Sequence, residues 1–287
     1  MLFLISCGNS DNRKVNSRAK APVVSEVKNT VIIPRELKEI SGISFANDSM
    51  VVAIQDETGI MFLFDLTKEA ITRQWQFGDE GDYEDVAVAG NTVYIVSSSG
   101  TIFQIDNFLS QPAPAKKYKT PLTEKNNIEG LAWDEKNNRL LVAAKDRGLK
   151  SKEDKEIYAF DLATKKLNTE PVYSIRLKEI EAFFEGDELE EASKDFLKAL
   201  GNQKLNKVFR TSALTYHPKT GELYVLTSLN NMIAVLSPST GKIQRIIELV
   251  GPDYNQPEGL AFTSDGRLFV SNESNGKKAN IIEINYE

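Results

Sequence analysis

The sequence predicts an all-β chain folded as a five-bladed β-propeller. A unit of two short strands joined by a tight turn occurs five times, and further strands follow each copy. A four-stranded sheet that recurs at intervals of about 40 to 50 residues is typical of a propeller blade. The chain has 287 residues, and a closed all-β ring of that length can form one domain around a large core.

The repeated unit is clearest at residues 255–273, which read NQPEGLAFTSDGRLFVSNE. Glu258 opens an apolar strand, Asp265 and Gly266 form the turn, and a second strand runs back to Asn272 and Glu273. Because antiparallel strands joined by a tight turn return to where they began, Glu258 and Glu273 should lie at the same end of the unit. We therefore expect function at this acidic end.

The first strands of the five copies share an acidic or small polar residue in second place. They read ISGISF (40–45), YEDVAV (83–88), IEGLAW (128–133), TSALTY (211–216) and PEGLAF (257–262). The residues in second place, called the ring residues below, are Ser41, Glu84, Glu129, Ser212 and Glu258, at separations of 43, 45, 83 and 46 residues. Second strands are predicted at 50–57, 92–99, 139–146, 222–228 and 267–273, and third strands at 60–66, 101–106, 157–162, 232–238 and 280–285. Fourth strands are predicted at 71–77, 116–119, 172–177 and 243–249.

The one long separation, of 83 residues, has a visible cause in the sequence. A helical pattern replaces strands between Lys178 and Asn206, and its apolar face is formed by Leu189, Ala192, Phe196 and Leu200. The pattern predicts one helical insertion, at about 178–206, between blades three and four. Such a helix could cover the channel mouth as a lid or pack on the surface against sheet edges, and the sequence favours neither.

The last copy has only three strands, whereas a strand pattern near residues 30–33 precedes the first copy. We expect this N-terminal strand to supply the missing outer strand of blade five. A closure of that kind leaves no open sheet edge at the seam of the ring.

The first residues, MLFLISCGNS, resemble a bacterial lipobox, in which a signal peptidase cuts before a cysteine that then carries a lipid. The polar stretch that follows is typical of a flexible tether. A signal peptide needs an apolar run of about 7 to 15 residues, so the start of such a segment would lie upstream of Met1 or the chain would be trimmed. We expect residues 1–22 to be a signal remnant and tether with a lipid anchor at Cys7, and residues 23–287 to form the propeller. The alternative is a frayed apolar terminus.

Composition excludes several classes of function. The net charge is −6 and basic residues are scattered, so nucleic acid is not an expected partner. The single cysteine cannot form an internal disulfide, and no Cys or His spacing indicates zinc. The only histidine, His217, lies in a YHPKTG turn at the opposite end from the ring residues, which disfavours a Ser-His-Asp hydrolase. No glycine-rich phosphate-binding loop occurs.

The ring residues are the strongest candidates for chemistry, because the first strand of each blade lines the channel of a propeller. Carboxylates from Glu84, Glu129 and Glu258 would repel one another on the axis unless protons or a cation neutralise them. Ca²⁺ accepts oxygen ligands in loose geometry, and Ser41 and Ser212 could complete its shell, whereas Mg²⁺ demands a tight octahedron. The alternative is that the three glutamates cap backbone N–H groups. Further residues expected on the same face are Asp56, Asp85, Asp146 and Glu273, although Asp56, Asp146 and Glu273 are better explained as ordinary turn residues, because Asp and Asn favour such loops through local hydrogen bonds.

Taken together, ISGISF, YEDVAV, IEGLAWDEKNNRLLVAAK, SALTYHPKTGELYVLTS and QPEGLAFTSDGRLFVSNE resemble the SdiA-regulated (YjiK-like) family of bacterial envelope proteins. The resemblance covers about residues 36–286, and similar single units occur in NHL-repeat and phytase-like propellers. It implies a five-bladed propeller with a bound calcium ion and no established reaction, in agreement with the number of blades expected from the repeats.

Three functions remain open. The leading expectation is a calcium-binding propeller tethered to the bacterial cell envelope, in the periplasm or at the outer membrane, that binds a ligand or partner at an acidic channel mouth without catalysis. The second is a calcium-dependent phosphoester or ester hydrolase of the phytase-like type. The third is a structural adaptor. We expect a monomer, since a closed ring needs no second chain to complete its sheets, and we expect contact with a membrane only through Cys7.

Overall fold

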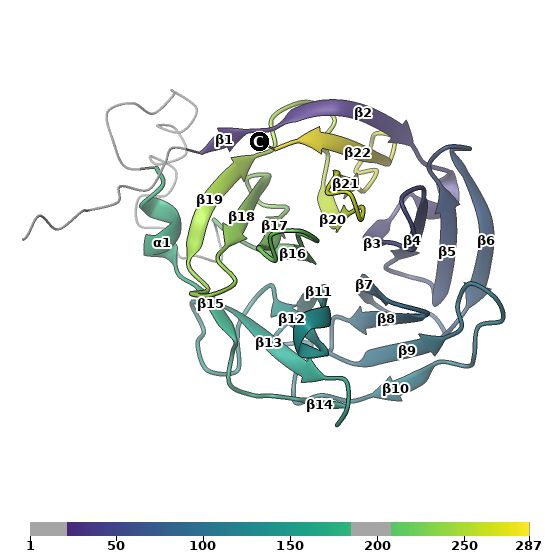
Figure 1. The fold of residues 1–287 in the computed structure, drawn as a ribbon, viewed down its shortest axis with the longest axis horizontal. Coiled ribbons are helices and arrows are strands. Elements are labelled where there is room, and N and C mark those ends of the chain that lie inside the picture. Colours follow the sequence, from purple (N-terminus) through teal and green to yellow (C-terminus); the bar gives the residue numbers. More distant parts are fainter. Residues whose placement is uncertain (1–21, 185–207, 287) are drawn as a thin grey trace, which may run out of the picture.

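A computed structural model describes residues 22–184 and 208–286, and its strands form five sheets around one axis (Figure 1). Blade one contains β3 (Ile40–Phe45), β4 (Met50–Gln55), β5 (Ile60–Asp65) and β6 (Ala70–Gln76). Blade two contains β7 (Tyr83–Ala89), β8 (Thr92–Ser97), β9 (Ile102–Asp106) and β10 (Lys116–Tyr118). Blade three contains β11 (Ile128–Asp134), β12 (Arg139–Ala144), β13 (Lys155–Asp161) and two outer pieces, β14 (Lys166–Leu167) and β15 (Tyr173–Ile175).

Blade four contains β16 (Thr211–Tyr216), β17 (Leu223–Thr227), β18 (Met232–Leu236), β19 (Ile243–Glu248) and the parallel strand β1 (Val23–Val24). Blade five contains β20 (Pro257–Phe262), β21 (Leu268–Asn272), β22 (Asn280–Asn285) and β2 (Glu26–Ile32). The five-bladed propeller predicted from the repeats is confirmed. The sequence did not indicate β1 or β14.

The N-terminal strand closes the ring as expected. β2 pairs antiparallel with β22, with Val31 opposite Ile281, although it comes from the other end of the chain. β1 continues this segment onto blade four, where Val23 lies opposite Ile247. One short stretch of chain therefore joins the last two blades and removes the open edge of β22.

Short helices occupy some of the connections. They are η1 (Arg35–Leu37), η2 (Glu135–Asn137) and α1 (Leu177–Glu181). α1 begins the insertion predicted between blades three and four, but Leu189, Ala192, Phe196 and Leu200 lie outside the described residues. No helix within residues 22–184 and 208–286 is long and apolar enough to span a membrane.

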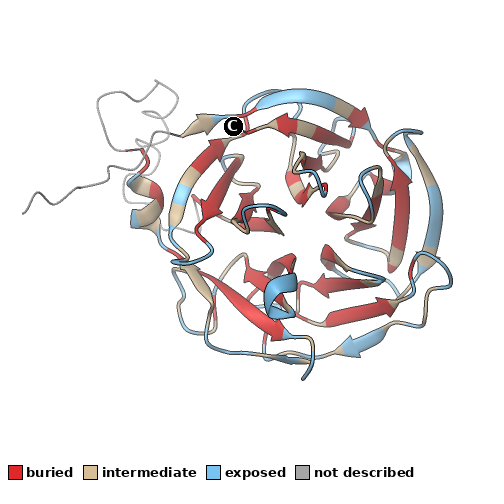
Figure 2. Ribbon diagram, viewed as in Figure 1, coloured by how far each residue is buried: buried red, intermediate tan, exposed pale blue. Residues whose placement is uncertain are grey.

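The core consists of five apolar clusters, one between each pair of neighbouring blades. The second strand of each blade is buried along nearly its whole length, as in β12, because both of its faces pack against other blades. Figure 2 shows this gradient, with buried inner strands and exposed outer strands. The rigid inner strands are therefore the elements that position side chains on the axis.

Candidate functional site

Every ring residue lies in a β-bulge. In β7 the pairing with β8 passes from Tyr83 to Asp85 and skips Glu84. The other four inner strands skip their ring residues in the same way: Ser41, Glu129, Ser212 and Glu258. A bulge leaves one residue out of the ladder and redirects its side chain, a device frequent beside functional sites. The five-fold recurrence places the ring residues at equivalent positions around one end of the channel.

A second ring of polar side chains lies two residues before the first. Its members are Glu39, Asp82, Asn127, Arg210 and Gln256. In blade three Asn127 Nδ2 donates to Glu129 Oε1 at 3.0 Å, and in blade five Gln256 Nε2 donates to Glu258 Oε1 at 2.9 Å. In blade two Asp82 and Glu84 share a hydrogen bond. Each ring glutamate is thus oriented by the side chain two positions before it.

The ends of the second strands reach the same mouth, as the sequence predicted. Backbone hydrogen bonds join Asp56 N to Glu39 O at 3.3 Å, Lys145 N to Asn127 O at 2.8 Å and Glu273 N to Gln256 O at 2.9 Å. The residue that follows β12 is a lysine, whereas the equivalent residues in blades one and five are Asp56 and Glu273. The mouth is therefore acidic around blades five, one and two, and basic around blades three and four, where Lys145, Lys155 and Arg210 gather.

Lys145 neutralises part of the ring. Its Nζ lies 2.5 Å from Glu129 Oε2, and the side chains of Lys145 and Glu129 are 16% and 6% exposed. Burial raises the pKa of Glu258, and the positive charge of Lys145 offsets part of this rise. Beside this pair, Arg210 Nη2 donates to Asp146 Oδ1 at 2.9 Å. The repulsion expected among the glutamates is thus relieved in part by the protein itself.

Burial, with a smaller contribution from neighbouring carboxylates, raises the pKa values of the carboxyl groups at the mouth. Burial, the neighbouring Glu129 and Asp82 raise the pKa of Glu84 to about 10. Burial raises the pKa of Glu129 to about 7, with Lys145 acting in the opposite direction. Burial and a hydrogen bond to Glu39 raise the pKa of Glu273 to about 8. At neutral pH the folded protein therefore keeps protons on part of its mouth.

The predicted calcium ligands fit an ion only in part. Their oxygen chemistry suits Ca²⁺, and Asp56 Oδ1 nearby is buried without a hydrogen-bond partner in the described residues. However, Glu129 and Glu258 already have partners, and within residues 22–184 and 208–286 no group of three or more His, Cys, Asp or Glu side chains is arranged to hold a metal ion. Calcium binding at Glu84, Glu129 and Glu258 stays a prediction.

The two ring serines bind neighbouring backbone. Ser41 Oγ donates to Tyr83 O at 2.7 Å, and Ser212 Oγ donates to Pro257 O at 3.0 Å. In each case the acceptor precedes the ring glutamate of the next blade. The serines therefore join blade one to blade two and blade four to blade five, and their hydroxyl groups are already engaged.

Asp85, expected near the mouth, lies inside the ring instead and is 1% exposed. Its carboxylate accepts from Leu131 N at 2.7 Å and Val86 N at 2.8 Å, and Leu214 N also donates to it. Burial nevertheless raises its pKa well above the ordinary value. Gly42 lies against this carboxylate and leaves room for it, because a Cβ at position 42 would lie 2.7 Å from Asp85 Oδ1. Asp85 thus joins three blades on the axis and is not presented to a ligand at the mouth.

His217 lies far from these groups and is committed to structure. Its Nδ1 accepts from Lys219 N at 3.1 Å and Thr220 N at 3.2 Å, so Nε2 carries the proton and faces Tyr286 Oη at 3.1 Å. Tyr286 Oη in turn donates to Gly266 O at 2.7 Å. This arrangement holds the imidazole in its turn and agrees with the expectation that it does not serve a triad.

The sequence profile of the SdiA-regulated family matches residues 26–276, from the closing strand β2 through β21. The chain belongs to the SdiA-regulated family. The resemblance seen in the repeat motifs is confirmed, and the matched span includes the ring residues of all five blades. No curated protein sequence matches the chain.

Solved structures with the same fold have very different sequences from this SdiA-regulated family member. The chain is similar to glutaminyl cyclase of Myxococcus xanthus, with a TM-score of 0.61 and 12% identity over 93% of this chain and 97% of that one. It is also similar to the PQQ-bound aldose sugar dehydrogenase of Streptomyces coelicolor, with a TM-score of 0.54 and 12% identity over 94% of this chain and 100% of that one. At such low identity the likeness shows the propeller fold alone.

Proposed function

We propose that this SdiA-regulated family member is a binding protein tethered to the cell envelope, whose acidic mouth takes up a cation, in the first place Ca²⁺, or the cationic group of a ligand. The observation that carries the proposal is the excess of carboxyl groups over basic groups at the mouth. Glu84, Glu258 and Glu273 are held there with raised pKa values. A cation that reached them would replace protons and relieve repulsion.

Calcium is expected to raise the melting temperature of the wild type relative to EDTA, by about 5–10 °C if the ion is present at about 100 times its Kd. Because Glu84 must lose its proton to bind the ion, and its pKa is about 10, the calcium effect should be larger at pH 8.5 than at pH 6. Melting curves in CaCl₂ and in EDTA at both pH values measure this.

The substitution Glu84→Gln should abolish the calcium effect while preserving the shape of the side chain. Glu135→Gln is the matched control, because Glu135 is exposed in η2 at the other end of the channel. Equal melting in calcium and EDTA for the wild type would reject the metal part of the proposal. An unchanged calcium effect in Glu84→Gln would reject the assignment of the site.

One observation favours the hydrolase as a second candidate. The pKa of Glu129, at about 7, suits a general acid or base, and Lys145 and Arg210 beside it could hold an anionic substrate. A panel of phosphate esters and carboxylic esters, assayed with wild type and Glu129→Gln, separates the two functions. Turnover that disappears in Glu129→Gln favours the hydrolase, and absence of turnover favours binding alone.

The proposed tether rests on Cys7 and the polar stretch that follows it, which lie outside the described residues. In a bacterial host that processes lipoproteins, the wild type is expected in the membrane fraction and Cys7→Ser in the soluble fraction, because lipid on the cysteine would provide the anchorage. Cell fractionation followed by immunoblotting measures this, and equal distribution of the two proteins would reject a lipid anchor at Cys7.

A further inference from the structure

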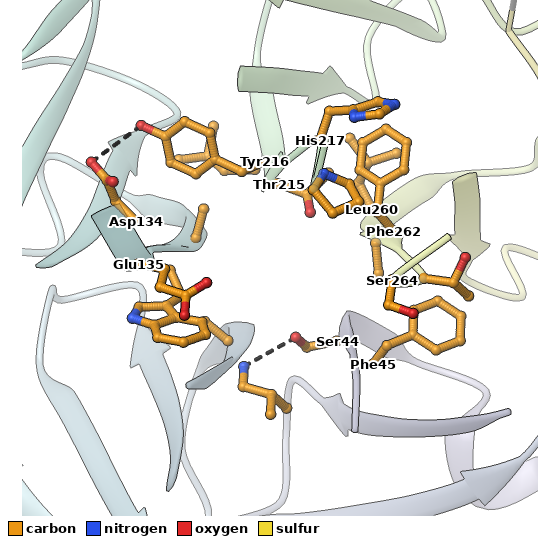
Figure 3. A pocket seen from close by; sticks show the side chains of 18 of the residues that line it. Ser44, Phe45, Asp134, Glu135, Thr215, Tyr216, His217, Leu260, Phe262 and Ser264 are labelled. Carbon is orange, nitrogen blue, oxygen red and sulfur yellow. Dashed lines mark hydrogen bonds between the residues drawn. The ribbon is translucent and has the colours of Figure 1, made fainter. Parts of the chain in front are cut away.

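The end of the channel opposite the mouth holds a cavity of about 860 Å³ (Figure 3). Its wall consists of the last residues of the five inner strands, the turns that follow four of them, and the side chains of Tyr173 and Pro238. This volume falls within the range of about 300–1,000 Å³ that is usual for small-molecule sites. We call this cavity the bowl.

The bowl has an aliphatic floor and a rim that is aromatic in four of the five blades, both built from the repeat. The floor consists of the fourth residue of each inner strand, each at most 2% exposed: Ile43, Val86, Leu131, Leu214 and Leu260. The rim consists of the sixth residue of each inner strand, each partly exposed: Phe45, Val88, Trp133, Tyr216 and Phe262. Residues two apart in a strand share a face, so every blade contributes one residue to each level. Figure 3 shows Phe45, Tyr216 and Phe262 around an open centre.

Polar groups lie among the floor and rim residues of the bowl. The indole of Trp133 and the hydroxyl of Thr215 line the bowl and make no hydrogen bond with the described residues. Ser44 Oγ accepts from Val88 N at 3.0 Å, which leaves its own proton for donation. The bowl therefore offers donors for a ligand that also presents apolar faces.

The charges around the bowl nearly balance, unlike those at the mouth. Asp134 is held by Arg139 Nε at 2.7 Å, and Lys219 Nζ donates to Asp265 O at 2.5 Å. The remaining charged side chains of the lining carry both signs: Asp48, Glu135 and Lys136. Without a dominant charge, the bowl has little electrostatic preference for an ionic ligand.

We propose that the bowl binds a short neutral saccharide. Aromatic rings match the C–H faces of a sugar ring, and the free donors of Trp133 and Thr215 match its hydroxyl groups. A purely apolar ligand would leave these donors unpaired, which costs affinity. The bowl is separated from the mouth by Asp85 and the aliphatic floor, so this site is independent of the proposed cation site.

The fluorescence of Trp133 can report sugar binding in the bowl. The chain has one other tryptophan, Trp75, which lies on the outer strand β6 under Arg73 and can be replaced. In the variant Trp75→Phe, the fluorescence of Trp133 is recorded during titration with maltose, cellobiose and diacetylchitobiose. We expect a saturable change with a Kd between about 10 μM and 1 mM for at least one of them. No saturable change with any of the sugars would overturn the proposal.

Calorimetry on further variants tests the contacts. Trp133→Ala should weaken binding at least about tenfold, whereas Trp133→Phe, which keeps a ring but loses the indole N–H, should weaken it only about threefold. Thr215→Val keeps the shape of the side chain and tests the hydroxyl should Trp133→Ala fail to fold; it should weaken binding about threefold or more. Glu84→Gln, at the mouth, should bind the sugar as the wild type does.

The ligand class is tested in the same experiment with choline and phenylalanine as probes. Tighter binding of choline would show a site for organic cations, and tighter binding of phenylalanine a site for aromatic amino acids; either result overturns the saccharide. Unchanged sugar affinity in a folded Trp133→Ala variant, or in Thr215→Val, would also overturn the saccharide proposal. None of these outcomes affects the calcium proposal, which is measured by melting at the mouth.

Discussion

Replacing Lys145 with methionine is expected to destabilise the propeller by about 1–2 kcal/mol at pH 8, because without its cation the buried Glu129 carboxyl can no longer ionise at a pH above its wild-type pKa of about 7. The Nζ to Oε2 distance of 2.5 Å and the small exposure of both side chains make this the most protected ion pair at the mouth. Urea denaturation in the presence of EDTA measures the effect, with bound divalent ions removed.

The loss of stability caused by Lys145→Met should increase as the pH rises. The pKa of Glu129 is raised from 4.5 to about 7, so between these values the folded state binds more protons than the unfolded state, and stability falls as the pH rises. Without Lys145 the pKa of Glu129 rises further, so the pH range over which stability falls extends to higher pH. The difference between wild type and Lys145→Met should therefore be small at pH 5 and large at pH 8.

Two controls separate this charge effect from simple loss of packing. The double variant Lys145→Met/Glu129→Gln removes both charges and should recover most of the stability at pH 8. Lys38→Met removes the cation that pairs with Glu39 at an exposed position, where the Lys38 side chain is 53% exposed, and should leave the free energy of unfolding close to the wild-type value. An equal loss at pH 5 and pH 8, or no recovery in the double variant, would show that Lys145 does not act through Glu129.

The sequence predicted the ring residues because the repeat itself carries them, yet it could not predict their bulges. A bulge appears only in the pairing of two strands, where Glu84 is skipped between Tyr83 and Asp85. The alternation that marks a strand gives no sign of it. The second ring was readable in principle, since Glu39 and Gln256 hold equivalent places two residues before Ser41 and Glu258.

Two features of the sites depended on tertiary structure. The ion pair of Lys145 with Glu129 could not be predicted, because it depends on how β12 ends beside β11. The bowl was not predicted, because an aromatic residue such as Trp133 or Tyr216 at the end of a strand is more often core. Only closure of the ring, which brings five such strand ends to one axis, leaves them partly exposed around a cavity.

Removing residues 1–33 is expected to lower the melting temperature by more than about 10 °C and to cause self-association. This segment includes β2, which pairs with β22 from Glu26 to Ile32 (Figure 1), and β1, which pairs with β19. Val31 and Ile33 are 5% and 6% exposed and pack in the cluster between blades five and one. Their loss would uncover apolar surface and leave β22 as an open edge that pairs with other molecules.

Thermal denaturation and light scattering measure this effect, and a truncation of residues 1–21 is the matched control because it keeps every described strand. The shorter truncation should melt within about 2 °C of the full chain. A peptide of residues 22–34, added to the longer truncation, should bind along β22 as an added strand and restore part of the melting temperature. If both truncations melt alike, blade five does not depend on its N-terminal strand, because the pairing that closes the ring would then contribute little to the free energy of unfolding.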